Sequence, residues 1–303
     1  MLVNTILMNR IYYNFIQLFY FEDLFKFKMN NTTSYGVDYS FIFNDLNRYF
    51  PIFDDLGVPV KEDLSYNISG ICGYGLAYWN LYLDTSDEEC RKKFNNQIEF
   101  LKKTPSFLYS SNLKLKGLST PWYSCLSQGL AASMFLRSYL LTASEVDKNN
   151  ARKCLDNILV KDYNLVSEFN NQLFLEEYPY ENPSHVLNGF LSAYIAFLEY
   201  KKITKDTTYD LVINCLFTSL DSNLHLFNKR NWSLYEITNG NLHNYATVHY
   251  HTLHIAQLEY VKYLTNVENF DNQIKIWKNS LFNLRLRFIP FLGKVVFRLH
   301  SKF

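Results

Sequence analysis

The chain of 303 residues carries almost no net charge, because 30 Lys and Arg face 29 Asp and Glu and leave a formal charge of +1 at pH 7. A nucleic-acid-binding surface spread over a whole molecule needs a clear excess of basic residues. The charge balance therefore argues against nucleic acid as the partner. Hydrophobic residues make up 48% and aromatic residues 17% of the chain, which is typical of a globular protein with a sizeable core.

Signals for secretion or membrane insertion are also missing. Residues 1–28 are apolar but repeatedly interrupted by polar side chains, so they do not form the uninterrupted run that spans a membrane. No short apolar segment with a small-residue cleavage site is present, and a secretory signal is not expected. The five cysteines have no CxxC spacing, and we interpret them as buried, reduced thiols of a cytoplasmic protein. They are Cys72, Cys90, Cys125, Cys154 and Cys215.

Apolar residues recur at helical spacing in segments that come in pairs. The first member of each pair is rich in glycine, aromatic residues and isolated polar residues, whereas the second is charged and amphipathic. The predicted helices cover about 70–83, 89–101, 122–141, 145–159, 184–200, 207–220, 251–264 and 269–282. Stacked pairs bury a continuous core. The pattern predicts an all-α fold, an α/α toroid of about four helix pairs with short β-hairpin or loop inserts.

Local signals refine this division. Ser86, with Glu89 three residues later, predicts a capping box at the start of the second helix. Residues 30–69 are polar and rich in turn-forming residues. We therefore expect an irregular or helical extension over 1–64, the helical barrel over 65–285 and a basic amphipathic tail over 286–303.

The stretch from Leu175 to Phe190 departs furthest from what packing alone would select. Glu176 and Glu177 precede a tyrosine and two prolines, after which a helical pattern begins. Prolines fix φ and hold the preceding residues extended. The stretch predicts a rigid polar rim beside a binding cleft, in which Glu176 is a solvated rim residue.

Four blocks of sequence carry a resemblance to a known family. They are Pro121–Gly129 (PWYSCLSQG), Glu176–Pro179 (EEYP) with Val186–Phe190 (VLNGF), Tyr235, and Tyr250–Leu258 (YHTLHIAQL). In order and spacing they resemble the C-terminal domain of the D-glucuronyl C5-epimerase family over about residues 65–285. The resemblance implies an α/α barrel and a cofactor-independent enzyme that inverts C5 of a uronic acid within a polysaccharide.

The family's catalytic residues correspond here to Glu177, Tyr178, Tyr235 and Tyr250. The chemistry can also be argued directly, because the C5 proton lies α to a carboxylate and its removal builds a second negative charge that the site must neutralise. Inversion needs a base on one face of the ring and an acid on the other. Glu177 is the candidate base. Tyr250 is the candidate acid, since a phenol with a pKa near ~10 stays protonated.

The chain departs from the family where arginines are expected. The Arg-His pair that follows Tyr235 in the family is replaced by Thr238 and Asn239, and a second arginine is replaced by Thr247. The cations that could substitute are His243, His249, His251 and Arg230.

Further residues of the blocks are candidate sugar contacts, with core packing or structural hydrogen bonds as the alternative for each. They are Trp122, Tyr123, Gln128, Asn188, His251 and His254. A metal site at His249, His251 and His254 is not expected, because no HExxH or comparable motif accompanies them.

The tail is basic and amphipathic. Between residues 273 and 303 it has seven basic and no acidic residues: Lys275, Lys278, Arg285, Arg287, Lys294, Arg298 and Lys302. Such a segment can lie on an anionic membrane surface or dock as a helix on the barrel.

The expected partner is a uronate-containing glycan or lipid-linked oligosaccharide, met in the cytoplasm or at the membrane periphery. A homodimer is compatible with the sequence. A carbohydrate-binding or scaffold protein that has lost epimerisation, and a polysaccharide lyase, are the alternative functions.

Overall fold

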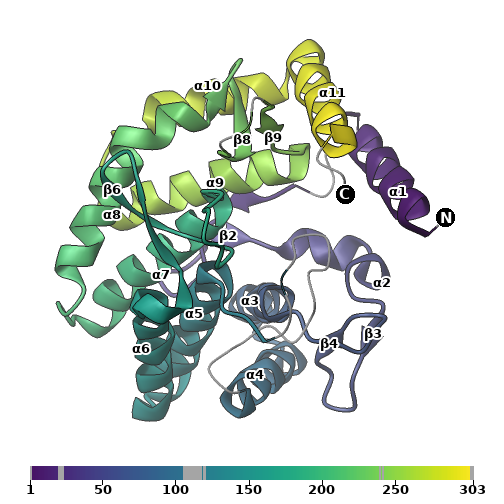
Figure 1. Ribbon diagram of the computed structural model, residues 1–303. Coiled ribbons are helices and arrows are strands. Elements are labelled where there is room, and N and C mark those ends of the chain that lie inside the picture. The colour runs from purple at the N-terminus through teal and green to yellow at the C-terminus, as the bar shows by residue number, and fades with distance from the viewer. Residues whose placement is uncertain are drawn as a thin grey trace.

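The computed structural model describes residues 2–19, 24–104, 118, 121–238, 240 and 242–300. Four helix pairs follow one another around the molecule (Figure 1). They are α3 (Ile68–Thr85) with α4 (Glu88–Lys103), α5 (Cys125–Thr142) with α6 (Glu145–Leu159), α7 (Leu187–Thr204) with α8 (Asp210–Asn223), and α9 (Val248–Thr265) with α10 (Asp271–Leu281). The predicted number of pairs is thus found.

The first members of the pairs form the inner wall. Helix α5 packs on α3 and α7, and α7 packs on α9. These four helices are buried over most of their length, whereas an outer helix such as α4 buries only one stripe that includes Phe94, Ile98 and Leu101. A helix that is apolar on all sides belongs inside and an amphipathic one belongs outside. The composition of the two helices in a pair therefore predicts which of them lies on the inner wall.

The predicted capping box at Ser86 and Glu89 is wrong. Ser86 has a left-handed backbone (φ 57°) and ends α3. Asp87 is the N-cap of α4, and its side chain accepts a hydrogen bond from the backbone N–H of Glu89 at 2.9 Å. Because the two helices are joined this tightly, the residue that ends the first helix cannot also cap the second.

The N-terminal part fills the space between the last inner helix and the first. The hairpin of β1 (Lys26–Phe27) and β2 (Val37–Asp38) packs on α9, and the 3-10 helix η1 (Ser40–Asn44) packs on α3. The rest of this part contains α1 (Leu2–Ile16), α2 (Leu46–Tyr49), β3 (Ile52–Phe53) and β4 (Pro59–Val60). The division of the chain at residues 64 and 285 stays a prediction.

Two small β inserts interrupt the helical order, as the sequence predicts. A 3-10 turn, η4 (Lys161–Tyr163), leads into the hairpin of β5 (Val166–Phe169) and β6 (Gln172–Leu175). A second turn, η5 (Leu224–Phe227), leads into a three-stranded antiparallel sheet of β7 (Asn228–Lys229), β8 (Trp232–Glu236) and β9 (Asn244–Tyr245).

A buried ion pair lies in the C-terminal halves of the inner helices α5 and α7. Arg137 of α5 donates to the carboxylate of Glu199 of α7, and its guanidinium also donates to the hydroxyl of Tyr260 on α9 at 3.1 Å and to the carbonyl of Ser34 at 3.1 Å. All of these groups are buried. The pair joins three inner helices and the N-terminal part.

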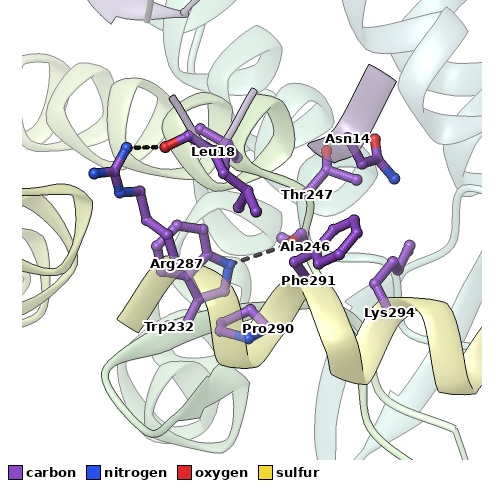
Figure 2. Close-up of a pocket in the computed structure, with 10 residues that line it drawn as sticks. Asn14, Leu18, Trp232, Ala246, Thr247, Arg287, Pro290, Phe291 and Lys294 are labelled. Carbon is purple, nitrogen blue, oxygen red and sulfur yellow. Dashed lines mark hydrogen bonds between the residues drawn. The ribbon is translucent and has the colours of Figure 1, made fainter. Parts of the chain in front are cut away.

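The basic tail folds as α11 (Leu284–His300), which packs on β9, α10 and α1. Arg287 of α11 donates to the carbonyl of Leu18, and Figure 2 shows this contact. Lys302 lies outside the described residues. Within the described part of the chain, no helix combines the length and apolarity needed to cross a membrane.

The cysteines are reduced, as interpreted from the sequence. All five are free thiols; four are buried and Cys215 is half-buried.

Candidate active site

The four predicted catalytic residues come together at the ends of three elements. Glu177 and Tyr178 directly follow β6, Tyr235 lies on β8, and Tyr250 lies in the first turn of α9. The hydroxyls of Tyr178 and Tyr235 are 3.3 Å apart. The rings of Tyr235 and Tyr250 meet edge to face with centroids 4.9 Å apart. These contacts join residues up to 57 positions apart in the sequence (235 − 178).

Local structure explains how each side chain is positioned. An isolated bridge between Val186 and Glu236 ties the start of α7 to β8. Thr247 is the N-cap of α9, and its hydroxyl accepts a hydrogen bond from the backbone N–H of Tyr250 at 3.3 Å. The threonine that stands where the family has an arginine therefore begins the helix that carries Tyr250.

Glu177 is only 6% exposed. Its Oε2 accepts a hydrogen bond from Nδ2 of Asn188, in the first turn of α7, at 3.1 Å. A Cβ at Gly189 would lie 2.7 Å from the Cβ of Glu177, so the glycine lets the carboxylate side chain pack against the start of α7. Asn188 is thereby placed beside the proposed base.

The phenols of Tyr178 and Tyr235 remain protonated at neutral pH. Burial and then the negative charge of Glu177 raise the pKa of Tyr178 well above its usual value, and the same two causes raise the pKa of Tyr235. Both hydroxyls can therefore donate a hydrogen bond to a group that gains negative charge. A carboxylate and a group of protonated phenols are what a two-sided proton transfer needs.

The expectation that Glu176 is a solvated rim residue is wrong. Glu176 is 1% exposed and its carboxylate accepts hydrogen bonds from the hydroxyl of Ser167 and from the backbone N–H of His185 at 3.1 Å. Its Oε1 also lies 2.7 Å from Nδ1 of His185. Glu176 therefore ties the β5–β6 hairpin to the turn before α7. Its surroundings differ from those of Glu177 because adjacent residues of an extended chain point to opposite sides.

The aromatic residues of the first block lie beside this site. Trp122 packs against Tyr178 with ring centroids 6.0 Å apart and is buried. Tyr123 stacks on Tyr163 of η4 with centroids 3.6 Å apart. Trp122 thus packs against a candidate catalytic tyrosine, whereas Tyr123 packs against η4.

Gln128 lies between the inner helix α5 and the outer helix α6. It is fully buried, and its Oε1 accepts a hydrogen bond from Asn157 of α6 at 3.2 Å. It joins an inner helix to its outer partner.

His251 and His254 lie in the wall between α9 and the small sheet. Nδ1 of His251 accepts from the backbone N–H of Ser233 at 3.1 Å, and its ring stacks on Trp232 at 3.8 Å. Nδ1 of His254 lies 2.9 Å from the hydroxyl of Ser233. Burial lowers the pKa of His251 to about 3 and that of His254 well below its usual value. Both imidazoles are therefore neutral at physiological pH.

The third histidine of the group, His249, packs instead against Phe25 and Phe41. Over the described ranges, no three His, Cys, Asp or Glu side chains gather in a way that could hold a metal ion.

Two of the suggested substitutes for the family arginines lie on the surface. Arg230 is exposed in the turn between β7 and β8, and His243 is also exposed. Asn239 lies outside the described residues. The basic side chain beside the tyrosines is Lys294 of α11, whose Nζ lies 4.8 Å from the ring centroid of Tyr235. Its signal in the sequence is spacing, because it shares a helix face with Phe291 and Pro290, three and four residues earlier.

The family model for the D-glucuronyl C5-epimerase C-terminus matches residues 99–279. This is more than half of the chain. The chain belongs to the D-glucuronyl C5-epimerase family. The sequence resemblance is thereby confirmed, and the matched part of this epimerase-family chain contains Glu177, Tyr178, Tyr235 and Tyr250.

Solved structures show the same fold. Cellobiose 2-epimerase from Bacillus thermoamylovorans B4167 matches with a TM-score of 0.59 and 11% identity, covering 78% of this epimerase-family chain and 68% of that enzyme. Cellobiose 2-epimerase from Spirochaeta thermophila DSM 6192 matches with a TM-score of 0.53 and 11% identity, covering 75% and 60%.

The family 76 mannosidase Bt3792 from Bacteroides thetaiotaomicron VPI-5482 matches with a TM-score of 0.50 and 14% identity, covering 78% and 71%. The predicted α/α toroid is confirmed.

Proposed function

We propose that the protein is a uronic-acid C5-epimerase acting on a glucuronate-containing polysaccharide or its lipid-linked precursor, without a cofactor. The observation that carries the proposal is the buried carboxylate of Glu177 beside the grouped tyrosines Tyr178, Tyr235 and Tyr250. Family membership supports it, since the matched model is that of a D-glucuronyl C5-epimerase domain.

The reaction needs two proton transfers. Glu177 takes the C5 proton from one face of the sugar ring, and the electron pair of the C–H bond moves into the adjacent carboxyl group. Tyr250 then gives its phenolic proton to C5 from the opposite face. Glu177 is left protonated and Tyr250 is left as phenolate, and both return to their resting states by proton exchange with water.

Tyr178 and Tyr235 donate hydrogen bonds toward the negative charge that builds up in between. Their raised pKa values keep these donors protonated. Asn188 holds the Glu177 carboxylate in place through its amide.

The test is exchange at C5 in deuterated water. Glucuronate-containing oligosaccharides are incubated with the protein, and deuterium at C5 and the configuration of the product are followed by NMR and mass spectrometry. Deuterium uptake with inversion is expected. An unsaturated product would establish a lyase instead, and glycan binding without exchange on any uronate tested would establish a binding protein.

Two variants assign the roles. Glu177→Gln and Tyr250→Phe are each expected to lower the exchange rate by about 10²- to 10⁴-fold, which is typical of a lost general base or acid. Glu181→Gln, at an exposed position four residues after Glu177, and Tyr263→Phe, near the other end of α9, are the matched controls. Exchange at the wild-type rate in both Glu177→Gln and Tyr250→Phe would remove these residues from the mechanism.

A further inference from the structure

Helix α11 brings a buried lysine to the edge of the tyrosine group. Lys294 is 8% exposed. Its Nζ donates to Oδ1 of Asn244 on β9 at 2.5 Å and lies 4.8 Å from the ring centroid of Tyr235. Figure 2 shows Lys294 on the face of α11 that also carries Pro290 and Phe291. A basic residue of the tail is thus built into the part of the fold that holds a proposed catalytic tyrosine.

The docking of α11 is specific. A Cβ at Gly293 would lie 2.6 Å from the ring of Tyr245, so the helix meets β9 at a contact that only glycine permits. At the same junction a cavity of about 10 Å³ lies between α11, the start of α9 and the residues after α1, and this is room for about one water molecule. The close fit fixes the position of the neighbouring Lys294.

Burying an ammonium group is unfavourable unless polar groups surround it. Asn244 accepts from Lys294 and in turn donates through Nδ2 to Oε1 of Glu236 at 2.6 Å. Glu236 directly follows Tyr235 and is itself buried. A polar chain from Lys294 through Asn244 to Glu236 therefore runs beside Tyr235, with the ammonium group at one end and the carboxylate at the other.

We infer that Lys294 is the cation that binds the carboxylate of the sugar acid and so makes the site prefer acidic over neutral sugars. The inference rests on the proposed function and names the residue that holds the reacting group. Removal of the C5 proton moves negative charge onto the carboxylate oxygens, and an ammonium beside them stabilises this charge in a site shielded from water. Arg137 cannot serve, since its guanidinium is held by Glu199.

The experiment measures preference rather than activity alone. Binding of a glucuronate-containing oligosaccharide and of the same oligosaccharide with its carboxyl groups reduced to alcohols is measured by calorimetry. Wild-type protein is expected to prefer the acidic form. Lys294→Gln is expected to weaken binding of the acidic form by about 10- to 100-fold, as for loss of a hydrogen bond to a charged group. Its binding of the reduced form should be unchanged.

Three further variants support the comparison. Lys294→Arg keeps the charge and is expected to retain most of the preference. Lys294→Met removes the charge while filling the same space, a change that buried sites often tolerate, and it replaces Lys294→Gln if the glutamine variant unfolds. Lys275→Gln, at an exposed position on α10, is the matched control and should behave as wild type.

The outcomes separate the inference from the proposed function, because C5 exchange is measured on the same samples. An unchanged preference for the acidic form in Lys294→Gln or Lys294→Met overturns the role of Lys294, whatever the exchange rate. If the wild-type protein shows no C5 exchange but prefers the acidic form, and Lys294→Gln loses this preference, the inference is supported and the epimerase function is overturned. A wild-type protein without any preference for the acidic form overturns the inference.

Discussion

The barrel holds two buried groups of glutamate and tyrosine, and they differ in what faces the carboxylate. In one, Glu199 is paired with Arg137 and the hydroxyl of Tyr260. In the other, Glu177 accepts from the neutral amide of Asn188 and lies near Tyr178.

The two groups occupy opposite ends of the inner helices. On α7, Asn188 and Glu199 are 11 positions apart (199 − 188), which is roughly 16 Å along a helix. Burial and Glu199 raise the pKa of Tyr260, while Arg137 opposes this. The comparison shows that a buried carboxylate paired with a cation, as Glu199 is with Arg137, stabilises the contact between inner helices. A carboxylate held by an amide and phenols keeps the capacity to take a proton.

The strongest way to break this comparison is to remove the cation of the first group. Arg137→Met leaves Glu199 buried without its partner and is expected to lower the free energy of unfolding by about 3–5 kcal/mol. Glu177→Gln keeps an acceptor oxygen for the amide of Asn188, and is expected to change it by less than about 1 kcal/mol. Urea titration of both variants measures the difference. Equal losses would show that the two carboxylates have the same structural role.

A second variant sharpens the comparison within one dipeptide. Glu176→Gln replaces a buried carboxylate that is bonded to Ser167 and His185, and a loss of about 1–3 kcal/mol in unfolding free energy is expected. Its C5 exchange rate should fall far less than that of Glu177→Gln. The result that would contradict this assignment is a stable Glu176→Gln protein that no longer exchanges.

The effect of pH on stability depends on His251, on the side of the barrel next to the candidate site. His251 is neutral in the folded protein, and its pKa is lowered from 6.5 to about 3. The unfolded chain therefore binds a proton that the folded chain does not bind between these pH values, and stability falls as the pH falls. The expected slope approaches about 1.4 kcal/mol per pH unit for this histidine.

Urea titrations between pH 7 and pH 4 measure this slope. His251→Gln should reduce it, whatever its effect on stability at pH 7, while His225→Gln, at an exposed position, is the matched control. An unchanged slope in His251→Gln would assign the acid sensitivity to other groups.

The sequence was sufficient for the helices but not for the roles of adjacent polar residues. Helix α6 covers 145–159 as predicted, because its charged face and its apolar stripe are both local signals. Glu176 and Glu177 carry no such signal. In an extended segment they must point to opposite sides, but only the packing of the β5–β6 hairpin decides which one faces the candidate site.

The position of Lys294 was beyond the sequence for a related reason. Its partner Asn244 lies 50 residues earlier in the chain, and the two meet only because α11 docks on β9. Composition described the tail as basic and amphipathic, which fits a helix on a membrane and a helix on the barrel equally well. Gly293 and the arginine contact to Leu18 are tertiary features. Contact with a membrane surface, a homodimer and the cellular location stay predictions.

The N-terminal strands have a consequence for how the molecule is made. The hairpin of β1 and β2 packs on α9, which lies more than 200 positions later in the chain. Contacts of such sequence separation form late, because closing the long loop between them is entropically unfavourable. On the ribosome the apolar side chains of Phe25 and Val37 must therefore wait until more than 200 further residues have been synthesised before α9 can cover them. Until then they are exposed apolar surface, which favours aggregation of the nascent protein.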